Sequence, residues 1–274
     1  MKNKYVWIVA VVVLAAFIAG FLWLFPERLP EESMSAPSEA IPVGKPTPAP
    51  AEPEPEAKAE PAIANPVVPE PTPEPLPKLD ESEASIVTAL GAVLDKSWMD
   101  VLIGEALIRK IVATVDQLPQ PTLPANVVPV KRVSGGLLIQ EVDGQRSISP
   151  HNAERYAEYM ARIERLDAKK LVTVYRQYYP LFQKAYAEIA KPGAYFNDRL
   201  VQAIDNLLAA PTPAEPIGLV QPKVLYAYAD PALDACSSGQ KILMRMGKAN
   251  AERVKAKLRE IRALVVSPPG AAKG

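Results

Sequence analysis

Two aspartates offer the strongest case for chemistry in this sequence. Asp198 and Asp205 lie seven residues apart in a stretch predicted as a helix over 196–208, and this spacing puts both on one face. Val201 and Leu208 flank Asp205, and apolar surroundings raise the pKa of a carboxyl group. Paired carboxylates can act as the acid and base of glycoside cleavage. The sequence therefore keeps open a carboxylate-dependent hydrolase acting on cell-envelope glycans.

A structural role for the same aspartates is the favoured interpretation. Cationic and tyrosine side chains can hold carboxylates in a polar network that fixes helix packing, and perturbed carboxylates also occur in such networks. The candidate polar network consists of Asp198, Arg199, Asp205, Asp230, Gln240, Lys241, Arg245 and Tyr179. No residue is predicted to be catalytic, and we expect the chain not to be an enzyme.

Signals for other catalytic or cofactor chemistry are weak. His151 is the only histidine, so a site built from several histidines is excluded, and its place two residues after Ser149 favours a capping or surface role. Gly135 and Gly136 precede strand-like residues instead of a helix, unlike a phosphate-binding loop. We expect no metal and no cofactor. Cys236, the only cysteine, is predicted to be a small buried residue.

The first part of the chain predicts a membrane anchor. Residues 6–25 carry no charge, and a helix of that length spans about 30 Å, the thickness of a bilayer's hydrocarbon core. Lys2 and Lys4 precede this run, whereas acidic residues dominate after it, so residues 1–5 are expected in the cytoplasm and the remaining chain outside. A cleaved signal peptide is the alternative, but its apolar region is usually only about 7 to 15 residues long.

Residues 26–78 predict a disordered linker rich in proline, glutamate and alanine. About half of the 30 prolines lie here, and the segment lacks the aromatic and branched residues that form a core. In polyproline form it would span on the order of 165 Å, against nearer 40 Å as a flexible coil. The whole chain has 31 basic and 31 acidic residues, a balance that gives no case for binding nucleic acid.

Residues 79–266 predict one mostly helical domain, followed by a disordered tail at 267–274. Helical periodicity begins near Asp80 and again over 101–118, and Pro180 predicts a kink or a break in a later helix. Residues 127–149 change to short strands with turns at Gly135-Gly136 and Asp143-Gly144. The predicted fold is therefore mainly α: a single-pass transmembrane helix, a disordered linker, and a helical-bundle-like domain with a small β-hairpin insertion.

Several strings in the predicted domain resemble one bacterial family, called domain of unknown function 3014. They are Leu79-Asp80-Glu81-Ser82, Val112-Ala113-Thr114-Val115-Asp116, Tyr179-Pro180-Leu181-Phe182, Phe196-Asn197-Asp198-Arg199-Leu200, Ala229-Asp230-Pro231 and Gly239-Gln240-Lys241-Ile242-Leu243-Met244-Arg245-Met246-Gly247. The resemblance implies an envelope protein of Gram-negative bacteria with an anchor, a proline-rich spacer and a mostly helical module. The family has no assigned reaction, so no catalytic residue can be transferred.

These observations together predict location more firmly than activity. We expect a single-pass protein of the bacterial inner membrane, contacting the membrane through residues 6–25, with a cytoplasmic N-terminus and a periplasmic C-terminal domain. The expected function is that of a non-enzymatic binding or scaffold module, held away from the membrane by the linker. Its expected partner is an envelope protein or the cell wall, and the glycan hydrolase remains the alternative.

Overall fold

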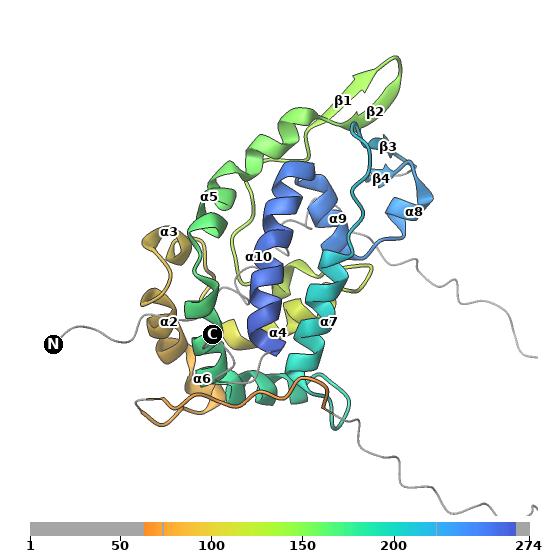
Figure 1. The fold of residues 1–274 in the computed structure, drawn as a ribbon. Helices are drawn as coiled ribbons and strands as arrows, with labels where there is room; N and C mark the ends of the chain where they lie inside the picture. The colour runs from red at the N-terminus through yellow and green to blue at the C-terminus, as the bar shows by residue number, and fades with distance from the viewer. Residues whose placement is uncertain (1–62, 73, 223, 267–274) are drawn as a thin grey trace, which may run out of the picture.

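The computed structural model describes residues 63–72, 74–222 and 224–266 of the 274-residue chain. Helices pack around one large apolar core, and a small sheet covers a second apolar cluster at one end of the molecule (Figure 1). The predicted membrane segment at 6–25 lies outside the described residues. Within the described residues, none of the helices combines the length and the apolar character that a membrane crossing requires.

Four helices form the centre of the domain, and contacts between them bury most of the core. They are α4 (Leu107–Gln117), α6 (Ala168–Ala187), α7 (Phe196–Leu208) and α10 (Lys248–Val266). Aromatic rings hold α6 against the start of α7: the rings of Phe182 and Phe196 stack with centroids 5.8 Å apart. The predicted helix over 196–208 therefore forms with the expected bounds.

Shorter elements form a layer beside α4 and α6. They are η2 (Leu79–Glu81), α2 (Glu83–Gly91), α3 (Lys96–Met99) and η3 (Ala125–Val127). The helix predicted over 101–118 begins only at Leu107, because the preceding residues pair with a distant segment. The amide of Ile103 donates to the carbonyl of Pro129 at 2.7 Å, and Leu102 forms a β-bridge with Val130.

The sheet has four antiparallel strands in the order β1-β2-β3-β4. They are β1 (Ile139–Val142), β2 (Gln145–Ile148), β3 (Gly218–Val220) and β4 (Ala227–Tyr228). Asp143 and Gly144 connect β1 to β2 with φ angles of 52° and 75°, as a two-residue hairpin turn requires. The small hairpin is confirmed, and two further strands from much later in the chain extend it into a sheet.

The remaining helices connect the sheet to the core. They are η4 (Pro150–Tyr156), α5 (Ala157–Arg165), α8 (Pro231–Asp234) and α9 (Ser238–Arg245). Helix α6 continues through Pro180, so the predicted interruption there is not a break. A proline inside a helix costs about 3 kcal/mol. Buried aromatic neighbours such as Tyr179 and Phe182 pack α6 into the core and offset that cost.

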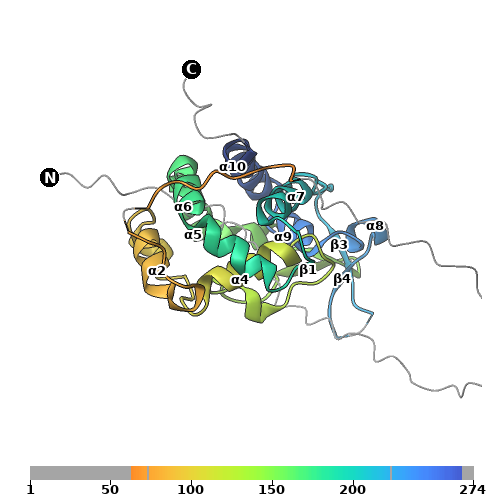
Figure 2. The same cartoon turned by 90° about the horizontal axis from the view of Figure 1, so that it is seen from below.

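The last part of the predicted linker packs on the folded domain. Residues 63–72, which we call the strap, run from α7 past α6 to the α2 side (Figure 2). Val67 packs against the core, and Glu70 lies 3.6 Å from the guanidinium of Arg176 on α6. The prediction placed these residues in a disordered segment, whereas their amides and side chains bind groups on the helices. This difference matters because the strap reaches one of the two candidate aspartates.

Candidate functional site

Asp198 binds the strap at the start of α7. Its Oδ2 accepts a hydrogen bond from the backbone amide of Ala64 at 3.1 Å. Its Oδ1 accepts two more, from the backbone amide of Asn65 at 2.7 Å and from the Asn65 side-chain amide at 2.9 Å. The first turn of a helix favours a negative charge, so Asp198 is well placed there. Both oxygens of this carboxylate therefore contact the chain's own strap.

Asn197, which is fully buried, completes the same contact from the neighbouring position. Its Nδ2 donates to the carbonyl of Asn65 at 2.9 Å and to the carbonyl of Val265 near the end of α10 at 3.1 Å. Its Oδ1 accepts from the hydroxyl of Tyr175 on α6 at 2.9 Å. One side-chain amide thus connects the strap, α6, α7 and α10.

Tyrosines close the site on the other side. The hydroxyl of Tyr195 accepts a hydrogen bond from the amide of Val67 at 2.8 Å. The ring of Tyr179 lies 5.4 Å from that of Tyr195, and burial, followed by its hydrogen bond with Tyr195, raises the pKa of Tyr179. Burial also raises the pKa of Tyr175 well above its usual value. Both phenols therefore remain protonated at physiological pH and keep their hydrogen atoms for donation.

We call Tyr195, Asn197 and Asp198 the strap seat. The backbone amides that it binds belong to Ala64, Asn65 and Val67, and Pro66 between them has no amide hydrogen to satisfy. The strap seat contacts mostly the main chain of the strap, which bends at Ala64 and Asn65, and one side chain, that of Asn65. The strap seat therefore holds a bent segment of the same chain.

The second candidate aspartate lies in a different contact. Arg262 on α10 donates from Nη2 to Oδ2 of Asp205 at 2.9 Å and from Nε to Oδ1. Arg199 binds a different carboxylate from the two candidates: its Nε donates to Oδ1 of Asp116 on α4 at 2.8 Å. Asp205 and Arg199 thus tie α7 to α10 and to α4, a role that holds helices together.

The other members of the predicted network lie near α8 and α9, except for Tyr179 on α6. Asp230 caps α8 by accepting from the amide of Ala232 at 2.8 Å. Gln240 forms a capping box with Ser237 at the start of α9 and donates to the carbonyl of Asn206 at 2.9 Å. These contacts satisfy backbone groups at helix ends, where partners inside the helix are missing.

Lys241 and Arg245 lie one helical turn apart on α9, and both are buried. The guanidinium of Arg245 lies 5.7 Å from the ring centroid of Tyr228 in β4, a distance typical of cation–π contact. The hydroxyl of Tyr228 donates to the carbonyl of Lys241 at 3.1 Å. This pair therefore belongs to the packing of α9 under the sheet. The eight residues predicted as one network are divided among several separate contacts.

The sequence analysis did not select Tyr195 and Asn197 of the strap seat as binding residues. It also did not select Asn65 of the strap, which the seat binds. Asn197 stands in the family string next to Asp198, so its position carried a usable signal. Asn65 is the single asparagine of the predicted linker, a departure from the proline, glutamate and alanine around it. The compositional prediction of disorder concealed that signal.

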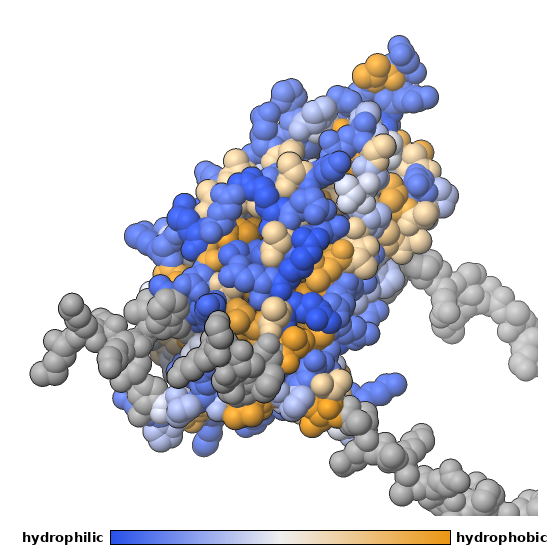
Figure 3. Space-filling view, viewed as in Figure 1, coloured by the Kyte–Doolittle hydropathy of each residue, from blue (hydrophilic) through white to orange (hydrophobic). Residues whose placement is uncertain are grey.

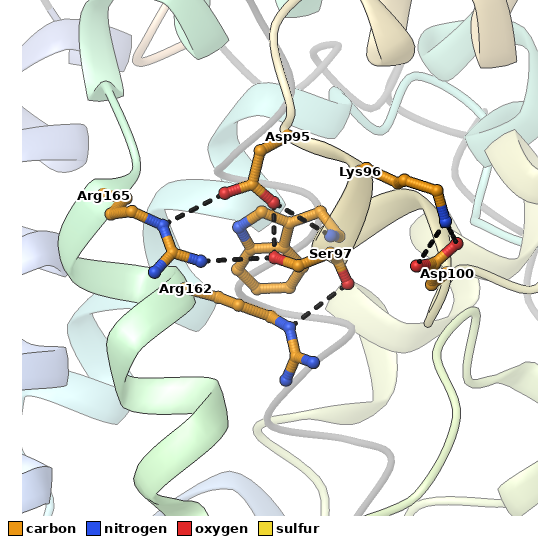
Figure 4. A network of polar contacts seen from close by, with 7 residues as sticks. Asp95, Lys96, Ser97, Asp100, Arg162 and Arg165 are labelled. Carbon is orange, nitrogen blue, oxygen red and sulfur yellow. Dashed lines mark hydrogen bonds and ion pairs between the residues drawn. The ribbon is translucent and has the colours of Figure 1, made fainter.

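A second polar cluster joins α3 to α5 (Figure 4). Asp95 caps α3 by accepting from the amide of Trp98 at 3.2 Å, and it also accepts from Nε of Arg165 at 3.1 Å. Arg162 donates to the carbonyl of Ser97 at 3.2 Å. Burial raises the pKa of Asp95, whereas hydrogen bonds from Ser97, Arg165 and the Trp98 amide lower it. The hydrogen bonds together outweigh burial, so the pKa lies below its usual value.

Metal and thiol chemistry find little support in the described part of the chain. Among residues 63–72, 74–222 and 224–266, no group of three or more histidine, cysteine, aspartate or glutamate side chains could hold a metal ion. Cys236 is partly buried, not fully as expected, and its Sγ lies 3.5 Å from the carbonyl of Ala232. Burial raises the pKa of this thiol, which keeps it protonated.

The fold and the site define a mainly helical domain with a small antiparallel sheet and a seat that holds a segment of the same chain. The family model described as Protein of unknown function (DUF3014) matches residues 107–262, more than half of the chain. The chain belongs to this family, which confirms the predicted membership. The match runs from α4 into α10 and leaves the strap outside. Neither the curated proteins nor the solved structures contain a match to this chain.

Proposed function

We propose that this protein is a non-enzymatic binding or scaffold module, anchored in the bacterial inner membrane and held in the periplasm by its proline-rich linker. One observation carries the proposal: both candidate catalytic carboxylates are engaged by groups of the domain itself. Asp198 binds the strap, and Asp205 is held by Arg262 in two hydrogen bonds. A general acid or base must reach a substrate atom within about 3 Å, and glycoside cleavage needs two such carboxylates. The pairing of Asp205 with Arg262 occupies one of them whether the strap is bound or released.

The sheet end of the domain supports a binding role. Val142 and Val220 belong to the sheet, Val224 lies in the loop between β3 and β4, and they are 59%, 46% and 86% exposed. Figure 3 shows apolar surface on the projecting hairpin. β1 ends the sheet in the described chain, and an edge strand offers unpaired backbone groups to a partner. Grouped exposed apolar residues are typical of protein interaction surfaces.

The position of the proposed tether is consistent with a partner surface at the sheet. The sheet lies at the opposite end of the domain from the strap, where the linker joins (Figure 1). Residues 26–62, the part of the predicted linker before the strap, would span about 115 Å in polyproline form. A module held at its strap end would present its sheet end to a partner farther from the membrane.

Photo-crosslinking in intact cells tests the partner surface. A photo-reactive residue in place of Val142 is expected to give discrete adducts of higher mass, which Val220→Lys would abolish. Ile189, in the turn after α6, is a matched control because it is also apolar and 55% exposed. Equal adducts from both positions, or none from Val142, would contradict the proposed surface.

Protease added to spheroplasts tests the proposed location. It should digest the domain, and protection of the domain would contradict a periplasmic location.

The hydrolase alternative has its own test. The purified chain should release no soluble fragments from envelope glycans, and Asp205→Asn should leave the crosslinks from Val142 unchanged. Circular dichroism would establish that the variant is folded. Glycan cleavage by the wild-type chain that is lost in the folded variant would replace the scaffold proposal with the hydrolase.

A further inference from the structure

We propose that the strap is a reversible latch, and that the strap seat is a peptide-binding site whose resident ligand is residues 64–67 of the same chain. Release of the strap exposes Tyr195, Asn197 and Asp198, which then accept another segment that contains Asn-Pro. This inference concerns the strap end of the domain. It stands or falls independently of the partner surface proposed at the sheet.

Recognition in the seat is mostly through the main chain. Asp198 accepts from two consecutive backbone amides, Asn197 donates to the carbonyl of Asn65, and Tyr195 accepts from the amide of Val67. These contacts fix the backbone, which bends at Ala64 and Asn65, without fixing most side chains. Pro66 fixes its own φ angle and narrows the conformations open to Asn65, which lowers the entropy cost of binding.

Asn65 supplies the side-chain specificity. Its Nδ2 donates to the same Asp198 oxygen that accepts its backbone amide, so the seat requires a donor at this position. An aspartate has almost the same shape but would oppose the carboxylate of Asp198 with a second one. Like charges in contact repel, and Asn65→Asp should therefore release the strap with little change in volume.

The strap is held lightly enough to open. Val67 packs against the core, but Ile63 and Val68, on either side of the latch residues, are 51% and 56% exposed, so few apolar contacts hold the segment. Local opening is easiest where buried apolar contacts are few. The covalent connection gives the strap an effective concentration on the order of millimolar, so a free peptide competes poorly until the latch is weakened.

Hydrogen exchange on the full chain tests the latch. Asn65→Asp should raise the exchange rates of the Ala64 and Val67 amides at least tenfold at neutral pH. Asn126→Asp makes the same change at an exposed residue and should leave both rates unchanged. The double variant Asn65→Asp with Asp198→Asn removes the repulsion and should restore most of the protection. Wild-type exchange rates in Asn65→Asp would overturn the latch.

Peptide binding tests the site itself. The probe is an isotope-labelled synthetic peptide of residues 62–70, AIANPVVPE, titrated to millimolar concentration and followed by nuclear magnetic resonance. It should bind the full-length Asn65→Asp chain at least tenfold more tightly than the wild-type chain, whose seat is filled. Addition of Asp198→Ala to that variant should abolish binding. If exchange shows a released strap and the peptide still does not bind, the seat is a packing contact and the proposal fails.

Discussion

Asp95 shows how one partly exposed carboxylate can connect two helices. It caps α3 through the amide of Trp98 and also accepts from Arg165 on α5 (Figure 4). Asp100, five residues later, makes only an exposed pair with Lys96 at 3.1 Å within the same segment. The two aspartates therefore differ in what they connect, although they lie close together in the sequence.

Asp95→Ala should lower the free energy of unfolding by about 1 to 2 kcal/mol, because the cap and the contact with α5 are both lost. Asp100→Ala should cost about 0.5 kcal/mol or less, since exposed ion pairs contribute little. Urea unfolding of the two variants in parallel gives the comparison. Equal losses would show that the link between α3 and α5 contributes nothing measurable.

The stabilisation by Asp95 should depend on pH in a defined direction. Its pKa in the folded chain lies below the ordinary value of 3.8, so the folded state favours the charged form. The difference in unfolding free energy between the wild type and Asp95→Ala should be constant from pH 5 to 7, to be checked by urea titrations. It should shrink as the pH falls below about 3.8 through the lower folded pKa. A difference that grows on acidification would contradict this assignment.

At the scale of elements, the sequence predicted best where the signals are local. The helix at 196–208 and the Asp143-Gly144 turn were expected and are present. The stretch at 101–106 was expected to be helical but is not, because Ile103 pairs with Pro129 across a long sequence separation. Helical periodicity reports only neighbours a few residues away, and a distant pairing leaves no trace in it.

The role of Gly239 in the packing of α9 was also not evident from the sequence. This residue lies in the first turn of α9. A Cβ at this position would come within 2.5 Å of Leu207 Cδ2 on α7 and 3.2 Å of the carbonyl oxygen of Leu118 after α4. The glycine therefore permits close packing of α9 against two other helices, and its absent side chain is a packing requirement.

Gly239→Ala should destabilise the domain by about 1 to 3 kcal/mol, because the clash outweighs the better helix propensity of alanine. Gly91→Ala is the matched control: its Cβ would meet only Met99 Cε at 3.9 Å, an ordinary contact. That variant should be neutral or stabilised by up to about 1 kcal/mol. Thermal unfolding of both measures the contrast, and a stable Gly239→Ala chain would show that Leu207 can move aside.

For the whole molecule, the sequence predicted the mainly helical domain with a small antiparallel sheet better than the site. Asp198 was predicted to have cationic and tyrosine partners, whereas its partner Asn65 lies 133 positions earlier in a segment assigned to disorder by composition. Composition measures whether a segment can form its own core, and the strap instead uses the core of the helices. A segment that folds only against another part of the chain is invisible to that criterion.

The contact of Asn197 with both Asn65 and Val265 has a consequence for the connectivity of the fold. Two carbonyls bound to one amide nitrogen lie within about 6 Å of each other, so the first and last described segments meet. A circular permutant joining residue 266 to residue 63 by a short glycine-serine bridge, and opened at exposed Val224, should fold. Its circular dichroism spectrum should match that of the parent; an unfolded permutant would mean that the order of synthesis, and not only proximity, shapes this domain.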